Sequence, residues 1–297
     1  MSKENEIKYT RSDNVLIKET AETLFSVNKS RPTPQSMQYL INKGATEHII
    51  KCAGLSVYGN SKIDDKYIEV AEHYLPSYHE LSDNIAKNFG KQIIIFLARD
   101  AETPFDDYTL RYPESRCSLM PASRKLWISK GMNDKALAKN FLSQYGLSKD
   151  TIYNPNDEFV LIDTGYKKTV LDLLSNAIDR TYDIDVVSLR RLKIRMSESR
   201  SEELQLPELK PISRIKSGFE PDINHELFRV TENLPKYLGE FVDLRYDAQS
   251  NRAVAVSSND SQAPECIGDD YINQGDIDPL SAAILQYRVV KAATQNL

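Results

Sequence analysis

The sequence is poor in the residues that define several special classes of protein. It has 3 cysteines, 11 glycines and 13 prolines among 297 residues, and 40% of its residues are hydrophobic. These values exclude a disulfide scaffold, a collagen-like repeat and a wholly disordered chain. Cys52, Cys117 and Cys266 are odd in number, lie far apart and form no CxxC pair, so neither a disulfide framework nor a thiolate zinc site is indicated. We therefore expect a reducing, cytoplasmic compartment.

Long apolar runs are also lacking. The polar N-terminus has no apolar core of a secretory signal, and no later stretch approaches the roughly 18 apolar residues of a membrane helix. A soluble chain without a membrane span is expected. The 38 basic and 43 acidic residues give a net charge of −5, which argues against a general nucleic-acid binder.

Hydrophobic patterning divides the chain into three predicted parts: a helical N-terminal portion (1–89), an α/β core (90–196) and a C-terminal extension that packs on the core (197–297). In the first part, short helical patterns are interrupted at Pro32 and Pro34. They resemble a helix-turn-helix but carry no strong basic face, so we interpret them as packing helices.

The middle part alternates apolar strands with helical stretches. The continuous apolar run 93–97 predicts a strand that is buried on both faces of a sheet. Further strands are predicted at 117–120, 159–162 and 184–189, the last with an extension to 196, and helices at 66–89, 134–145 and 171–178. This alternation predicts an α/β fold, with a mostly parallel sheet of about four to six strands flanked by helices.

The last part of the chain is less regular. Residues 197–217 have a linker-like composition, and 228–246 are predicted to form a helix followed by a short strand. Residues 257–279 contain six acids and no base, which predicts an exposed loop. A final helix at 280–293 has one apolar side and is expected to dock. This irregular extension is a candidate contact surface for a protein partner.

The segment after the strand at 159–162 carries the strongest chemical signal. Asp163 comes directly after the strand, a Thr-Gly turn follows, and a helix begins near Thr169. The free amides at the start of that helix form an anion site, and an open α/β fold places its ligand groups at the carboxyl edge of the sheet. The alternative is a simple Thr-Gly turn with Asp163 as a local cap.

Two other strand ends carry similar groups. Arg99 and Asp100 follow the run 93–97, where an arginine fork suits phosphate and a carboxylate suits a hydroxyl or a hydrated metal. Their alternative is an ion pair that closes the strand. Ser123 and Arg124 follow the next strand, and their alternative is a helix start with a surface arginine.

The order of these motifs resembles that of the divergent type I phosphoribosyltransferase-like family, over roughly residues 90–195. FLARDAETP (96–104) is similar to the family's first loop, which receives pyrophosphate. VLIDTGYKKT (160–169) is similar to its later loop around the ribose 5-phosphate, although the usual acidic pair is reduced to Ile162-Asp163 and three residues are inserted after the Thr-Gly turn. The resemblance implies a phosphoribosyltransferase-like fold.

The resemblance also implies a function: transfer or cleavage at a phosphorylated ribose or nucleotide, with Mg²⁺ and pyrophosphate handling. Asp163, Arg99 and Asp100 would be catalytic, and Asp100 and Asp163 would hold the metal. The phosphate-binding residues would be Thr164, Gly165, Tyr166, Lys167, Lys168, Thr169, Ser123 and Arg124.

Two other functions remain open. A noncatalytic nucleotide or phospho-sugar binding module is favoured by the single acid before the second loop. A haloacid dehalogenase-like phosphatase would use Asp100, but the Asp-x-Asp-x-Thr order of that class is not met. The histidines show no metal-ligand spacing. The basic stripe at 190–195 is typical of a solvent-facing edge strand, where charge blocks further strand pairing.

Overall fold

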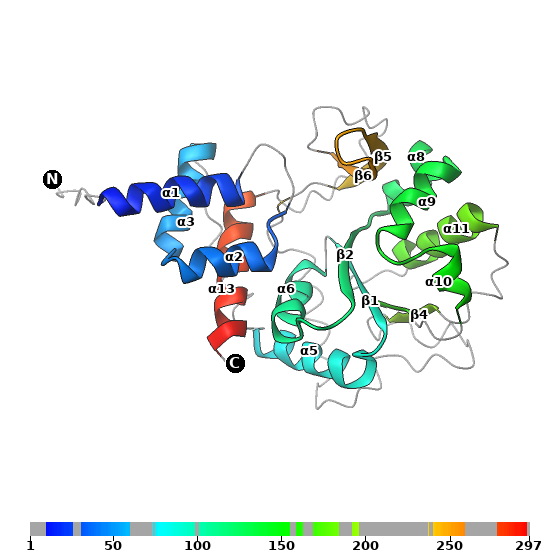
Figure 1. Ribbon diagram of the computed structural model, residues 1–297, viewed down its shortest axis with the longest axis horizontal. Helices are drawn as coiled ribbons and strands as arrows, with labels where there is room; N and C mark the ends of the chain where they lie inside the picture. Colours follow the sequence, from blue (N-terminus) through cyan, green and yellow to red (C-terminus); the bar gives the residue numbers. More distant parts are fainter. Residues whose placement is uncertain are drawn as a thin grey trace.

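The protein is represented here by a computed structural model. It describes residues 10–25, 31–59, 73, 75–98, 101–154, 159–162, 169–183, 192–195 (backbone), 237, 240–258 and 278–295. Figure 1 shows two groups of elements side by side, a helical unit and an α/β unit. The helical unit consists of α1 (Arg11–Leu24), α2 (Pro34–Asn42), α3 (Glu47–Tyr58) and α13 (Pro279–Gln295).

The first three helices begin at threonine caps. Thr10, Thr33 and Thr46 each accept a hydrogen bond from the backbone amide three residues later, which satisfies one of the unpaired amides at a helix start. The apolar sides of these helices surround α13 in one buried cluster. At the crossing of α3 and α13, a Cβ on Gly54 would lie 2.5 Å from Leu280 Cδ1, so glycine permits the close approach.

The α/β unit is built on a parallel sheet. Its described strands are β1 (Ile93–Ala98), β2 (Cys117–Pro121), β3 (Phe159–Ile162) and β4 (Leu192–Arg195), in the order β2-β1-β3-β4. All three neighbouring pairs are parallel. The prediction of an α/β fold with a parallel sheet is confirmed.

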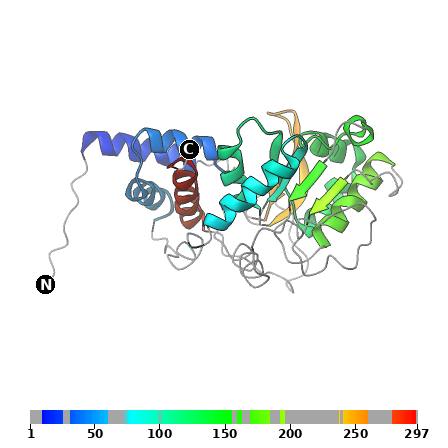
Figure 2. The same ribbon diagram turned by 90° about the horizontal axis from the view of Figure 1, so that it is seen from below.

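Strand β1 lies at the centre and is buried on both faces. Ile93, Ile95 and Leu97 pack on one face with α7 to α11, while Ile94 and Phe96 pack on the other with α5 and α6. Helices therefore cover both faces of the sheet, as Figure 2 shows from below. The helices of this unit are α5 (Leu75–Phe89), α6 (Glu102–Arg111), α7 (Arg124–Ile128), α8 (Lys130–Asn133), α9 (Lys135–Ser143), α10 (Lys149–Tyr153) and α11 (Thr169–Tyr182).

A β-hairpin covers the outer side of α7, α8 and α9. Strands β5 (Phe241–Asp247) and β6 (Arg252–Ser257) pair antiparallel, and the turn between them includes Asn251 at φ 55°. The Ala253 backbone accepts from Gln144 Nε2 at 2.9 Å and donates to Asn140 Oδ1 at 2.7 Å, which fixes β6 on α9.

Some elements were not predicted from the sequence, and parts of others lie outside the described residues. Helix α5 covers Leu75–Phe89 of the helix predicted at 66–89, of which 66–72 and 74 lie outside the described residues. Pro76 lies in the first turn of α5, where a missing N–H is tolerated. Helix α6 and strand β6 were not predicted. The predicted strand near the end of 228–246 is confirmed as β5, but 228–236 lie outside the described residues, as do 184–191, 197–217 and 259–277.

The packing groups two helices differently from the three-part division of the sequence. Helix α5, the last helix of the predicted N-terminal portion, packs on β1 and α6 in the α/β unit. Helix α13, from the predicted C-terminal extension, packs on α2 and α3 as well as on α6. The final helix therefore docks, and it contacts both the N-terminal helices and α6 of the α/β unit.

Replacement of Gly131 with Ala is expected to loosen the hairpin. A Cβ there would lie 2.5 Å from the Leu244 carbonyl oxygen and 2.8 Å from Asp243 Oδ1, and the latter already accepts a hydrogen bond from the Gly131 amide at 2.8 Å. We expect a loss of about 1–3 kcal/mol in the free energy of unfolding, because backbone must move to make room. Hydrogen exchange at 241–257 measures this. Exposed Lys130→Ala is the control, and an unchanged exchange rate in Gly131→Ala would show that the contact is unimportant.

Candidate functional site at the carboxyl edge of the sheet

The strand order creates a topological switch point. From β1 the chain crosses through α6 to β2 on one side, whereas β3 lies on the other side of β1. In open α/β sheets the connections diverge at such a point, and ligands bind outside the carboxyl ends of the strands there. Phe96 of β1 is paired with Ile162, the last residue of β3, so the two strands end at the same edge.

The predicted catalytic residues follow these two strands in the sequence. Arg99 and Asp100 come after β1, and Asp163 comes after β3. These three residues lie outside the described part of the chain, as do the predicted phosphate-binding residues 164–168. Thr169 is the first residue of α11. Their assignment therefore stays a prediction, supported by the adjacency of the strands that precede them.

The start of α6, immediately after this edge, differs from the other described helix starts. Its N-cap residue is Ala101, which makes no side-chain cap. Helices α1, α2, α3, α7, α8, α9 and α10 each receive a hydrogen bond from a Thr, Ser or Asp side chain at that position. Among the described residues, no side chain caps the first amides of α6, and such a helix start suits an anion.

Ser123 and Arg124 are described, at the end of β2. The Ser123 hydroxyl is buried, accepts a hydrogen bond from the Leu126 amide at 3.0 Å and donates to the Phe241 carbonyl. It therefore caps α7 and holds β5. Arg124 is exposed at the first position of α7. A phosphate contact by either residue stays a prediction.

A buried polar group that the sequence did not reveal lies beside the start of α6. We call it the Arg31 cluster: Arg31, Glu102, Asp106, Tyr237 and Gln286. Arg31 Nε donates to Glu102 Oε2 at 2.8 Å, and its Nη2 donates to Asp106 Oδ2. The Arg31 side chain is 10% exposed and that of Asp106 is 2% exposed. A buried guanidinium that binds two carboxylates couples the charges of all three groups strongly.

Burial dominates the electrostatics of this cluster. It raises the pKa of Asp106 to about 6, although Arg31 opposes the rise. It likewise raises the pKa of Tyr237 well above its usual range. For Arg31, burial disfavours the charge, but Asp106 and Glu102 outweigh that effect and raise its pKa.

A second polar cluster joins α5 to α6. The buried Asp107 carboxylate contacts His79 Nδ1 at 2.6 Å and accepts from Ser82 Oγ at 2.6 Å. Because Ser82 donates to Asp107 and not to His79, the three residues do not form the hydrogen-bond chain of an activated serine. Their effect is to satisfy a buried carboxylate between two helices.

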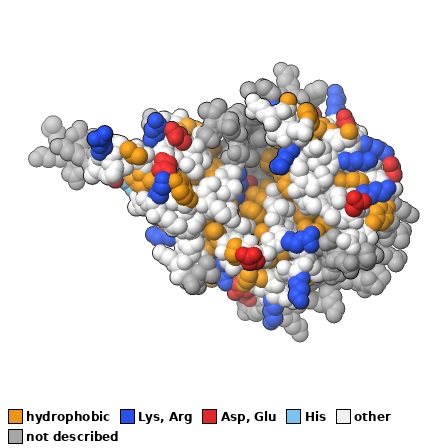
Figure 3. All heavy atoms as spheres, viewed as in Figure 1, with side chains coloured by type: hydrophobic (Ala, Val, Ile, Leu, Met, Phe, Trp, Pro, Cys, Tyr) orange, Lys and Arg blue, Asp and Glu red, His pale blue; other side chains and the backbone are white. Residues whose placement is uncertain are grey.

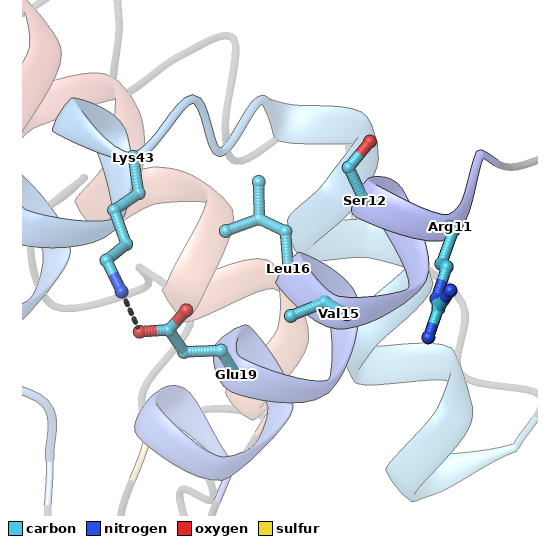
Figure 4. Close-up of a pocket in the computed structure, with 6 residues that line it drawn as sticks. All are labelled: Arg11, Ser12, Val15, Leu16, Glu19 and Lys43. Atoms are coloured by element: carbon cyan, nitrogen blue, oxygen red, sulfur yellow. Dashed lines mark hydrogen bonds and ion pairs between the residues drawn. The ribbon is translucent and has the colours of Figure 1, made fainter.

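Two surface features lie away from the sheet edge. The helical unit has a surface hollow of about 480 Å³. Lys43 Nζ and Glu19 Oε1 form an ion pair there at 2.6 Å, and Figure 4 shows this pair beside Val15 and Leu16 of α1. Figure 3 shows basic side chains over α8 and α9. The exposed lysines of this region and of α10 are Lys130, Lys135, Lys139 and Lys149.

Three comparisons give no relative from which to assign the site. Neither protein-family models, nor curated proteins, nor solved structures yield a match to this chain. Within the described residues, three or more His, Cys, Asp or Glu side chains nowhere gather as a metal site would require, and no helix is both long and apolar enough to cross a bilayer.

Proposed function

We propose that the chain is a phosphoribosyltransferase-like enzyme that binds a phosphorylated ribose or nucleotide at the carboxyl edge between β1 and β3. The observation that carries this proposal is the switch point, because it joins the strands that precede Arg99, Asp100 and Asp163 in the sequence. The start of α6, without a side-chain cap, supplies a favourable position for a phosphate or pyrophosphate anion.

In this proposal the acidic residues bind the sugar and the metal. Asp163 binds the ribose hydroxyls, and Arg99 with Asp100 binds the pyrophosphate and its Mg²⁺. Residues 164–169 form the 5-phosphate loop at the start of α11. When bound, Mg²⁺ would neutralise charge on the departing pyrophosphate. Asp100 and Asp163 are the residues that would hold this ion.

Titration with phosphoribosyl pyrophosphate and Mg²⁺ tests the proposal. Release of pyrophosphate supports the enzyme, whereas binding without turnover supports a noncatalytic binding module. Release of inorganic phosphate from phosphate esters would support a phosphatase instead. Failure to bind any of these anions would overturn a phosphate site at this edge.

Replacement of Asp163 with Asn is expected to abolish turnover, because the neutral amide keeps one acceptor oxygen but loses the second acceptor and the negative charge that would hold the ribose hydroxyls and a cation together. The melting temperature should stay nearly unchanged. Initial rates of pyrophosphate release and a thermal melt measure the two effects. Asp150→Asn, at an exposed position on α10, is the control, and a rate equal to that of the control would remove Asp163 from the mechanism.

A further inference from the structure

The Arg31 cluster connects the helical unit to the start of α6 through an unbroken chain of contacts. On α13, the buried Gln286 donates from Nε2 to the Pro32 carbonyl at 3.0 Å and accepts from the Tyr237 hydroxyl at 3.1 Å. Pro32 is adjacent to Arg31, whose guanidinium reaches Glu102 and Asp106 on α6. These contacts therefore join the helical unit to α6.

The point of attachment is the first two turns of α6. Glu102 is the first residue of this helix and follows Ala101, the N-cap residue that makes no side-chain cap. Asp106 is four residues further along the same face. Arg31 Nη2 also lies 3.5 Å from the Glu102 carbonyl oxygen. Since a planar guanidinium binds with a fixed geometry, it restrains both the position and the rotation of this helix start.

We propose that Arg31 is a positioning residue, which holds the amides at the start of α6 at the carboxyl edge of β1 and makes their position depend on the helical unit. The part concerning anion binding rests on the proposed function. The part concerning the position of α6 does not, because it follows from the contacts alone.

The expected direction of the pH effect follows from burial. Asp106 is the carboxyl group that takes up the proton. Four side chains face it: Glu102 on the same helix, Arg31 before α2, Gln286 on α13, and Tyr237. The pKa of Asp106 is about 6 in the closed cluster and returns toward its ordinary 3.8 when the cluster opens to water. The closed cluster binds the proton more tightly, so opening becomes easier as pH rises through this interval.

Hydrogen exchange of the α6 amides at 105–108, corrected for the intrinsic effect of pH, tests this. In the wild type we expect their protection to fall about tenfold between pH 5 and pH 7. Asp106→Asn should abolish that pH dependence. At pH 7, Arg31→Met should lower the protection at least tenfold, which corresponds to a change on the order of 1.4 kcal/mol in the free energy of opening. The loss should be smaller at pH 5, and Arg31→Lys should have an intermediate effect.

The matched control is Arg288→Met. Arg288 binds both oxygens of Glu47 at 2.9 and 3.0 Å, but this pair lies within the helical unit, between α13 and α3. The control should leave α6 protection unchanged. An equal loss of α6 protection in Arg31→Met and in Arg288→Met would overturn the proposal, as would a pH dependence that persists in Asp106→Asn. If Arg31→Met does not fold, Arg31→Lys and Asp106→Asn decide the question.

Calorimetric titration with pyrophosphate separates this inference from the proposed function. We expect Arg31→Met to weaken pyrophosphate binding at least tenfold relative to Arg288→Met, on the order of 1.4 kcal/mol. If Arg31→Met binds pyrophosphate as tightly as the wild type, the proposed function stands, but the positioning role of Arg31 at that site is overturned. If the wild type binds no pyrophosphate, the proposed function fails, and hydrogen exchange alone then supports or overturns the role of Arg31 in positioning α6.

Discussion

Replacement of Arg31 with Met is expected to lower the free energy of unfolding by about 3–5 kcal/mol at pH 7, because it leaves Glu102 and Asp106 as unpaired buried carboxylates. Both residues are almost excluded from water, so solvent cannot replace the guanidinium. Urea unfolding followed by fluorescence measures the loss. Trp127 is the single tryptophan of the sequence and is fully buried, which makes it a suitable reporter.

The loss should be smaller at pH 5 than at pH 7. The pKa of Asp106 is already raised to about 6 with Arg31 present, so without Arg31 this carboxyl takes up a proton at pH 5 and loses its unpaired charge. Lys43→Met is the control, since Lys43 and Glu19 form a surface ion pair, and pairs of this kind contribute little to stability. A loss in Arg31→Met no larger than in this control would show that the cluster contributes little to stability.

Replacement of Phe96 with Ala is expected to cost about 3–5 kcal/mol, through lost apolar burial and the cavity that remains. Phe96 is fully buried in the central strand, and its ring lies 5.6 Å from that of Phe105 and 5.5 Å from that of Tyr108, measured between centroids. The same urea titration measures the effect.

The matched control for Phe96→Ala is Tyr153→Ala. Tyr153 is 45% exposed on α10, and an exposed position of this kind changes stability by only about 0.5 kcal/mol. A cost below about 1 kcal/mol for Phe96→Ala would mean that the two faces of β1 are not packed as described.

The central strands could be predicted because their sequence signal and their environment agree. A continuous apolar run at 93–97 has no polar face, so only a strand covered on both sides satisfies it, and β1 is covered on both sides. The same reasoning correctly placed β3 at 159–162. The helix predicted at 134–145 is α9, which begins after its Asp134 cap.

Helix α6 and Arg31 could not be predicted in the same way. The start of α6 is rich in acids and contains Pro104, which indicates a loop, yet proline is tolerated in a first turn. Its buried acids are stabilised by Arg31, which is distant in sequence and lies in a segment whose prolines indicate only a break. No local pattern reports a pairing between such distant residues. The sequence therefore led to the sheet edge but not to the arginine beside it.

The late position of α13 in the chain has a consequence for synthesis. Helices α1 to α3 leave the ribosome long before 279–295, with the α/β unit translated in between. Until α13 emerges, apolar side chains such as Met37, Leu40 and Ile50 lack the helix that buries them in the complete fold. A nascent chain stalled before residue 279 should therefore bind chaperones through its first helices, even while its sheet is already folded.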